Sequence, residues 1–201
     1  MRAAWAVVVG GALPLLLGTT LGSTTTTAGA GTWAAPMPAG AFLALSLGLA
    51  VSHLLVLPAY TALARQGAGW TGRAALLGAA GSAVLAACEV WSGLLARTAL
   101  GSPVLVALDA GYLVSALAVV VGTLVAAVGL WRSVPRSPLA WPVLVNGLLL
   151  LVATVVKYLV SDGLGIAALT AWSLSYVWWG LRLRRGTTSR PRSQTVDASA
   201  A

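Results

Sequence analysis

The chain has 201 residues, of which 59% are hydrophobic and only 8% are charged. Charged residues usually make up about a quarter of a soluble domain, so this composition excludes a soluble globular protein and predicts surfaces that face lipid. The net charge is +8, but the twelve basic residues lie between apolar segments rather than along one polar face, which argues against a nucleic-acid partner.

Six apolar segments follow one another along the chain, and each is long enough to cross a bilayer, which takes about 20 residues per helix. They span residues 3–21, 40–64, 74–96, 104–131, 139–160 and 164–181. The sequence therefore predicts an all-α fold, a polytopic membrane helical bundle with six transmembrane helices in a single transmembrane domain, residues 1–185. The polar, basic stretch 186–201 predicts a disordered cytoplasmic tail.

The first segment, 3–21, has two interpretations. One is a secretory signal peptide, because the small residues from Ala28 to Ala30 offer a cleavage site. The other is a retained transmembrane helix, which is favoured because only Arg2 provides a basic flank and the apolar run is long for a signal peptide. The uncharged loop 23–38 that follows contains Trp33, which we expect at the level of the lipid headgroups.

The second segment carries His53, the single histidine of the chain, near its midpoint. A single imidazole cannot form a bis-histidine haem site and seldom holds a metal alone. We expect a hydrogen-bonded structural histidine. The alternative is a proton relay with Glu89.

The third and fourth segments carry one acid each, Glu89 and Asp109, and the fifth carries Lys157 near its end. A helical rise of about 1.5 Å per residue places all three in the outer half of the membrane. A charged group in the hydrocarbon costs about 2.5–3.5 kcal/mol, so each must face a partner, water or the bundle interior. Small residues share the helix face of Glu89 and predict close helix packing there: Gly78, Ser82, Ala86 and Gly93.

Two arrangements of these charged groups are compatible with the sequence. In the first, Glu89, Asp109 and Lys157 line an outward-facing polar cavity for a cation, a proton or a small molecule, with Arg97 and Asp162 at its rim. In the second, the acids pair with the bases and fix the packing of the third, fourth and fifth helices. The second is favoured, because a nearby base removes most of the reason for an acid to recruit a ligand.

The distribution of basic residues predicts the orientation of the bundle, because short cytoplasmic loops retain Lys and Arg. With six spans, ten basic residues fall on the side of the two termini, and only Arg97 and Lys157 fall on the other side. We therefore expect a multi-pass protein of the plasma membrane with both termini in the cytoplasm. A cleaved first segment would leave five spans, with the remaining loops on the same sides.

The sequence contains no phosphate-binding glycine loop, no HExxH zinc motif and no paired intramembrane aspartates. Its one cysteine, Cys88, excludes an internal disulfide. We expect no enzymatic activity, no cofactor and no metal, with the lipid bilayer and other membrane proteins as partners and no identifiable soluble substrate. The leading hypothesis is a structural, sensory or accessory membrane component. A small proton- or cation-coupled transporter that uses Glu89, Asp109 and His53 is the second hypothesis, and an intramembrane enzyme acting on lipid is the third.

Several short motifs occur along the chain from Ala64 onward. They are the basic turn 64–73, Glu89-Val90-Trp91, Leu130-Trp131-Arg132-Ser133, Ala140-Trp141-Pro142 and the terminal Leu183-Arg184-Arg185. In these motifs the chain resembles a loose group of uncharacterised six-helix, multi-pass membrane proteins common in high-GC, actinobacterial-type genomes. The resemblance implies a helical bundle in the membrane, and it implies no activity, cofactor or site residue.

Overall fold

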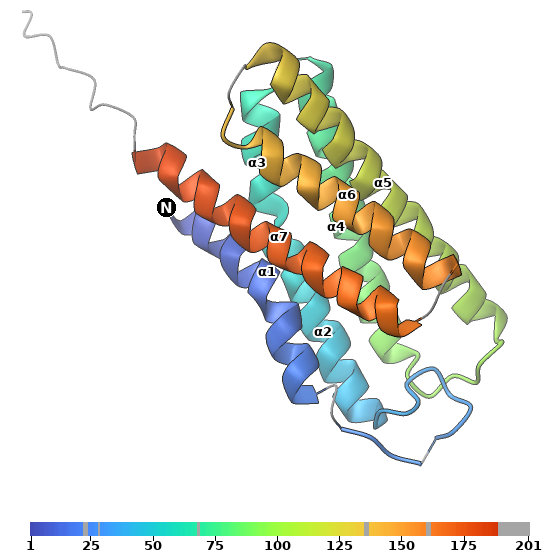
Figure 1. Ribbon diagram of the computed structural model, residues 1–201. Coiled ribbons are helices and arrows are strands. Elements are labelled where there is room, and N and C mark those ends of the chain that lie inside the picture. The colour runs from blue at the N-terminus through green and yellow to red at the C-terminus, as the bar shows by residue number, and fades with distance from the viewer. Residues whose placement is uncertain (22–23, 28, 68, 135–136, 160–161, 189–201) are drawn as a thin grey trace, which may run out of the picture.

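The computed structural model describes residues 1–21, 24–27, 29–67, 69–134, 137–159 and 162–188. Within these residues the chain forms α-helices in the order α1 Arg2–Leu21, α2 Ala39–Leu55, α3 Leu57–Gln66, α4 Trp70–Leu94, α5 Pro103–Ser133, α6 Ala140–Leu159 and α7 Asp162–Thr188 (Figure 1). The described residues contain no strand, and their one β-type pairing is an isolated bridge between Thr32 and Ala99. The predicted all-α class is confirmed.

Five segments of the described chain are long and apolar enough to cross a membrane. They are Arg2–Leu21, Ala39–Gln66, Trp70–Leu94, Pro103–Ser133 and Ala140–Lys157. Many large apolar side chains on these helices are exposed, among them Leu94, Val106 and Val114, and lipid is the solvent that suits such a surface. The prediction of apolar helices compatible with a membrane bundle is therefore confirmed for five segments. The sixth predicted span, 164–181, lies within α7, which is helical but is not one of the five.

The second predicted span, 40–64, is two helices rather than one. α2 ends at Leu55 and α3 begins at Leu57, with Pro58 in the first turn of α3. Proline lacks a backbone N–H, and its ring clashes with the carbonyl oxygen four residues earlier, so an uninterrupted helix is disfavoured at this point. The break separates α2, which lines a cavity described below, from α3, which closes the opposite end of the bundle.

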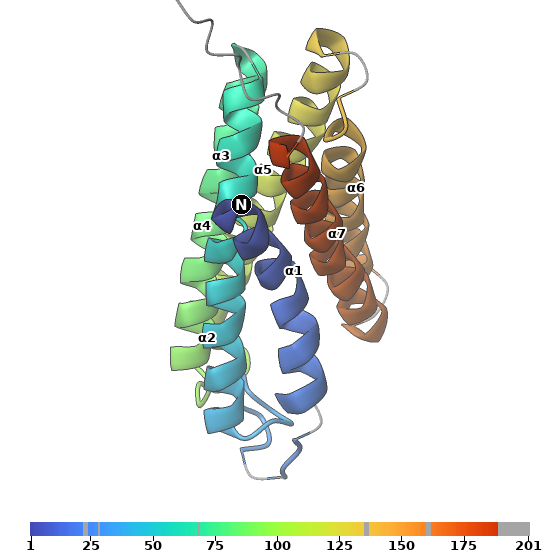
Figure 2. The same cartoon turned by 90° about the vertical axis from the view of Figure 1, so that its left-hand side faces the viewer.

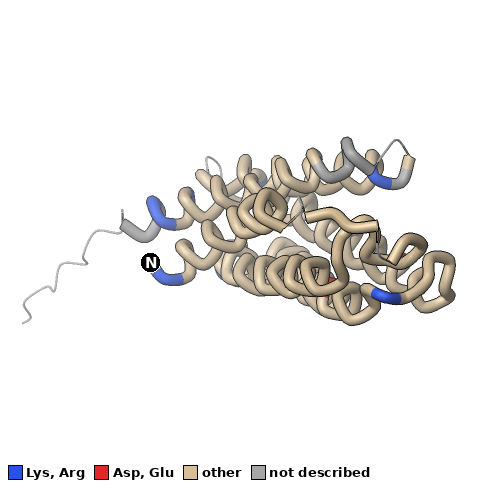
Figure 3. The backbone as a smooth tube through the Cα atoms, turned by 90° about the horizontal axis from the view of Figure 1, so that it is seen from below, with Lys and Arg blue, Asp and Glu red and all other residues tan. Residues whose placement is uncertain are grey.

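The long helices form a closed ring. In the order α1, α2, α4, α5, α6 and α7, each helix packs against the next, and α7 packs against α1. Both views show α7 lying alongside α1 and α6 (Figures 1 and 2). We call the end where the 24–38 segment connects α1 to α2 the loop end. Basic residues lie near the ends of the helices, and long stretches without charge separate them (Figure 3).

Glycine allows two pairs of neighbouring helices to approach closely. A Cβ atom added to Gly122 on α5 would lie 2.5 Å from the backbone nitrogen of Gly78 and 2.7 Å from the carbonyl oxygen of Ala74, both on α4. On α1, a Cβ atom at Gly11 would lie 2.7 Å from the carbonyl oxygen of Ser173 on α7. The small residues predicted to pack on the Glu89 face of α4 are all buried: Gly78, Ser82, Ala86 and Gly93. The predicted packing face is confirmed.

A dense aromatic core fills the half of the ring that lies away from the loop end. Tyr60, Tyr176 and Trp179 are at most 2% exposed, and the Tyr60 and Tyr176 hydroxyl oxygens lie 2.5 Å apart. The rings of Tyr176 and Trp179 stack with centroids 5.8 Å apart. Trp179 lies near the end of a predicted span, a position that favours an anchor at the membrane interface. That interpretation is wrong, because its ring is buried and packs from α7 against Tyr60 of α3. We call this group of side chains the aromatic floor.

Candidate functional site

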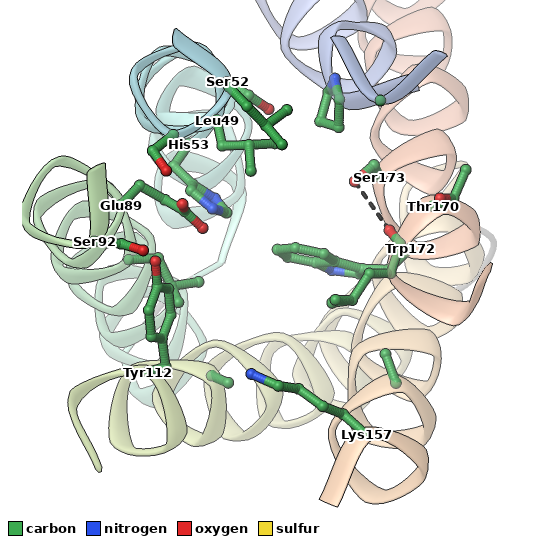
Figure 4. A pocket seen from close by; sticks show the side chains of 18 of the residues that line it. Leu49, Ser52, His53, Glu89, Ser92, Tyr112, Lys157, Thr170, Trp172 and Ser173 are labelled. Atoms are coloured by element: carbon green, nitrogen blue, oxygen red, sulfur yellow. Dashed lines mark hydrogen bonds between the residues drawn. The ribbon is translucent and has the colours of Figure 1, made fainter. Parts of the chain in front are cut away.

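A cavity of about 670 Å³ occupies the loop-end half of the ring. Side chains from α1, α2, α4, α5, α6 and α7 line it, together with Trp33, Pro36 and Met37 of the 24–38 segment. Figure 4 shows these side chains arranged around a hollow between the helices. Tyr176 borders the cavity where the aromatic floor begins. The ring therefore has one packed half and one hollow half.

Glu89 extends from α4 into this cavity and is partly buried (Figure 4). The Tyr112 side chain on α5 lies near its carboxylate and near Ser92. Among the described residues, no base forms an ion pair with Glu89. Lys157 forms its close ion pair with Asp109 instead, although its ammonium still interacts electrostatically with the Glu89 carboxylate. A direct pairing of Glu89 with Lys157 or Arg97 stays a prediction.

Lys157 forms its ion pair with Asp109. The Lys157 Nζ and Asp109 Oδ1 atoms are 3.8 Å apart, and the two side chains are 38% and 44% exposed, respectively. The ammonium also lies 5.7 Å from the centroid of the Tyr112 ring, and Lys157 borders the cavity. Asp109 is not among the residues that line the cavity. The two intramembrane acids thus have different environments, one in an exposed ion pair between α5 and α6 and the other inside the hollow.

His53 lies on α2 and lines the cavity near Glu89 (Figure 4). Its side chain is only 9% exposed, and its ring is tilted against that of Trp172 on α7, with centroids 5.9 Å apart. None of the described residues forms a hydrogen bond with its imidazole. The expectation of a hydrogen-bonded structural histidine is therefore wrong for the described chain. Both ring nitrogens are left for a ligand or for water.

Arg97 lies outside the cavity. It is an exposed residue of the link between α4 and α5. The 24–38 segment forms backbone hydrogen bonds with this link. The Trp33 N–H donates to the Thr98 carbonyl oxygen at 2.9 Å, and the Leu100 N–H donates to that of Gly31 at 2.8 Å. The side chain of Asp162, expected beside Arg97 at the rim, lies outside what the structure describes.

Trp33, which is expected at the headgroup level, also contacts the end of α4. Its indole Nε1 donates to Ser92 Oγ at 2.8 Å, and its ring lines the cavity. The same segment therefore covers the loop end of the bundle and contributes to the cavity wall.

The cavity has the composition of a small-molecule site. Most of its surface is apolar, and twelve of the 28 described lining residues also carry a hydroxyl, carboxyl, imidazole or ammonium group. Ligand cavities usually have volumes of about 300–1,000 Å³ with such a lining. One further polar group lacks a partner, since Trp172 Nε1 is buried and forms no hydrogen bond within the described chain. Figure 4 shows the Trp172 ring extending into the hollow toward Glu89 and His53.

Sequence reasoning missed Trp172, Ser92 and Trp33 as cavity residues. Trp172 carried a usable signal, because it is the tryptophan that lies in the middle of a predicted span rather than near a span end. The other two give no such signal, because their roles depend on a loop that folds back over the helix ends. Among the described residues, no group of three or more His, Cys, Asp and Glu side chains is arranged to hold a metal ion.

Comparison of the chain with protein-family models, with curated protein sequences and with solved structures gives no match. That the chain belongs to the actinobacterial-type group that its motifs resemble remains a prediction.

Proposed function

We propose that this chain is a plasma-membrane protein without enzymatic activity that binds a small, largely apolar molecule in the cavity at its loop end. Its role in the cell would be sensory or accessory. The observation that carries the proposal is a cavity of about 670 Å³, lined by all six long helices, which contains an acid, Glu89, with no ion pair among the described residues. A purely structural bundle would gain stability by filling such a space, because interiors of proteins are close-packed.

The proposed topology has six spans with both termini in the cytoplasm. The packing of α7 against α1 and α6 supports a sixth span, because without α7 the ring would be open along one side. The packing of Gly10 and Gly11 against α2 and α7 supports a retained first helix, and Ser52 Oγ on α2 donates to the Gly10 carbonyl oxygen at 2.6 Å. The basic residues on the side of the termini then place the cavity toward the outside.

A second candidate function is a small carrier for the same ligand. The observation that favours it is the aromatic floor, a discrete barrier that separates the cavity from the opposite end, beside the break between α2 and α3. A carrier would have to open this barrier during transport. Uptake of a ligand into proteoliposomes would support the carrier, and binding without uptake would support the sensory or accessory protein.

A cavity-filling variant tests the binding function. In Leu49→Trp the larger ring would fill part of the cavity, because Leu49 lines it. Leu47→Trp is the matched control, because Leu47 lies on the same helix and is 44% exposed on the outer surface. We expect Leu49→Trp to weaken binding of radiolabelled 4-phenylbutanol to the full chain in lipid nanodiscs by about tenfold or more, equivalent to about 1.4 kcal/mol. Leu47→Trp should bind like the wild type. Equal binding by both variants would contradict a ligand site in this cavity.

A further inference from the structure

We propose that the ligand is a lipophilic amine, whose ammonium group binds Glu89 and whose apolar body fills the rest of the cavity. This inference rests on the proposed binding function and specifies the chemical class of the ligand.

The charges around the cavity favour a cation. The Lys157 ammonium borders the cavity and interacts electrostatically with Glu89, but its ion pair is with Asp109, which offsets part of its charge. Glu89 is the charged group of the lining whose described contacts include no ion pair. An ammonium would neutralise its carboxylate away from bulk water. An anionic ligand would instead add a second negative charge beside Glu89, and the ammonium of Lys157 already has a carboxylate partner.

The aromatic side chains of the lining also suit an ammonium group. Trp172 extends into the hollow from α7, opposite Glu89 on α4, and Tyr112 adjoins the Glu89 carboxylate from α5 (Figure 4). Ring faces attract cations through their quadrupole, and tryptophan does so most strongly. The imidazole of His53, which lacks a hydrogen bond within the described chain, supplies an additional acceptor when it is neutral.

The rest of the lining requires an apolar body on the ligand. Each of α2, α4 and α6 contributes apolar surface to the wall, for example through Leu49, Leu85 and Leu150. A small hydrated inorganic cation would leave this surface in contact with water. A molecule with one ammonium group and an aromatic or aliphatic body of drug-like size would cover both the polar and the apolar parts of the wall.

Three probes of equal length separate charge from shape: 4-phenylbutylamine, 4-phenylbutanol and 4-phenylbutyrate. Their binding is measured with radiolabelled compounds and the full chain in nanodiscs, with empty nanodiscs as background. We expect the amine to bind at least about tenfold more tightly than the alcohol, and the carboxylate to bind most weakly. Glu89→Gln should abolish the preference for the amine and leave binding of the alcohol unchanged, which also shows that the variant is folded.

Two further variants separate the effect of the Glu89 charge from other effects on binding. Glu89→Asp retains the charge and should retain part of the preference for the amine. The double variant Asp109→Asn/Lys157→Gln removes the ion pair and should keep or strengthen the preference for the amine, because the Lys157 ammonium at the edge of the cavity opposes a second cation. If this double variant is unfolded, Glu89→Asp alone distinguishes loss of charge from loss of shape.

The outcomes distinguish the two proposals. If Glu89→Gln binds the alcohol and still prefers the amine, the amine site is wrong. The proposed binding cavity would not be contradicted by this result. Equal binding of amine and alcohol to the wild type would lead to the same conclusion. Failure of all three probes to bind above background would count against both the ligand class and the binding function.

Discussion

Glu89 and Asp109 are both acids within long apolar helices, but the side chains opposite them differ. Asp109 on α5 meets Lys157 on α6 at 3.8 Å, whereas Glu89 on α4 points into a hollow, with Tyr112 nearby. Helical periodicity identifies the face on which each acid lies. It does not identify which helix packs against that face. The side chains of that neighbouring helix decide whether an acid is paired or can bind a ligand.

Replacing Glu89 by glutamine should have little effect on stability. The change breaks no ion pair within the described chain, and the amide keeps the size and one acceptor oxygen of the side chain. We expect the free energy of unfolding to change by less than about 1 kcal/mol. The measurement is thermal denaturation of the detergent-solubilised protein, followed by circular dichroism.

Asp109→Asn is the matched acid-to-amide control for this measurement. It removes a carboxylate that pairs with Lys157 within the membrane span, so we expect Asp109→Asn to lower stability more than Glu89→Gln does. A loss of stability in Glu89→Gln as large as that in Asp109→Asn would show that Glu89 fixes helix packing. That outcome would support the charge-pairing interpretation and remove the reason for a ligand.

At the scale of elements, the contact between α4 and α5 depends on glycine, and the break between α2 and α3 depends on proline. Both features follow from local chemistry. Gly122 lets two backbones meet without an intervening side chain, and Pro58 prevents one continuous helix across the second span.

A methyl group at Gly122 should separate α4 from α5. The added Cβ atom of Gly122→Ala would lie 2.5 Å from the Gly78 nitrogen and 2.7 Å from the Ala74 carbonyl oxygen, and these backbone atoms cannot rotate away. We expect a loss of about 1–3 kcal/mol, as for other overpacked sites, measured by thermal denaturation in detergent.

Gly40→Ala is the control for overpacking, because the first turn of α2 leaves open space around Gly40. There alanine should be neutral or should stabilise the helix by up to about 1 kcal/mol. Equal stability of the two variants would mean that α4 and α5 do not approach as closely as the structure describes.

At the scale of the whole molecule, the sequence predicts the helices well and their assembly poorly. The length of an apolar segment is a local property of the sequence. The predicted spans and the observed helices therefore agree closely from α1 to α6, apart from the break between α2 and α3. The ring and its hollow half arise from contacts between segments far apart in the chain. Trp33 and Trp179 show why these were not predictable: both lie near span ends, where lipid interfaces attract tryptophan. One ring nevertheless packs in the aromatic floor and the other in the cavity wall.

The orientation of the molecule decides which compartment supplies the ligand, and cysteine labelling tests it. Gln66 and Leu100 flank α4 at opposite ends of the bundle, and both are exposed. In a Cys88→Ser background, a membrane-impermeant maleimide applied to intact bacterial cells should label Leu100→Cys, and should label Gln66→Cys only after permeabilisation. This result is expected because most basic residues lie on the Gln66 side. Wild-type Cys88, 7% exposed, is the control and should label weakly in both conditions.

The pattern of labelling separates three arrangements. Labelling of Gln66→Cys alone from outside would invert the bundle and make the cavity open toward the cytoplasm, so that the ligand would have to come from inside the cell. Labelling of both positions from the same side would mean that α4 does not cross the membrane. That outcome would conflict with its length, because the 25 residues of this largely apolar helix extend about 37 Å at 1.5 Å per residue, more than the hydrocarbon thickness of about 30 Å. Labelling of Leu100→Cys alone would leave the cavity facing the medium, where an extracellular amine can enter without first crossing the bilayer.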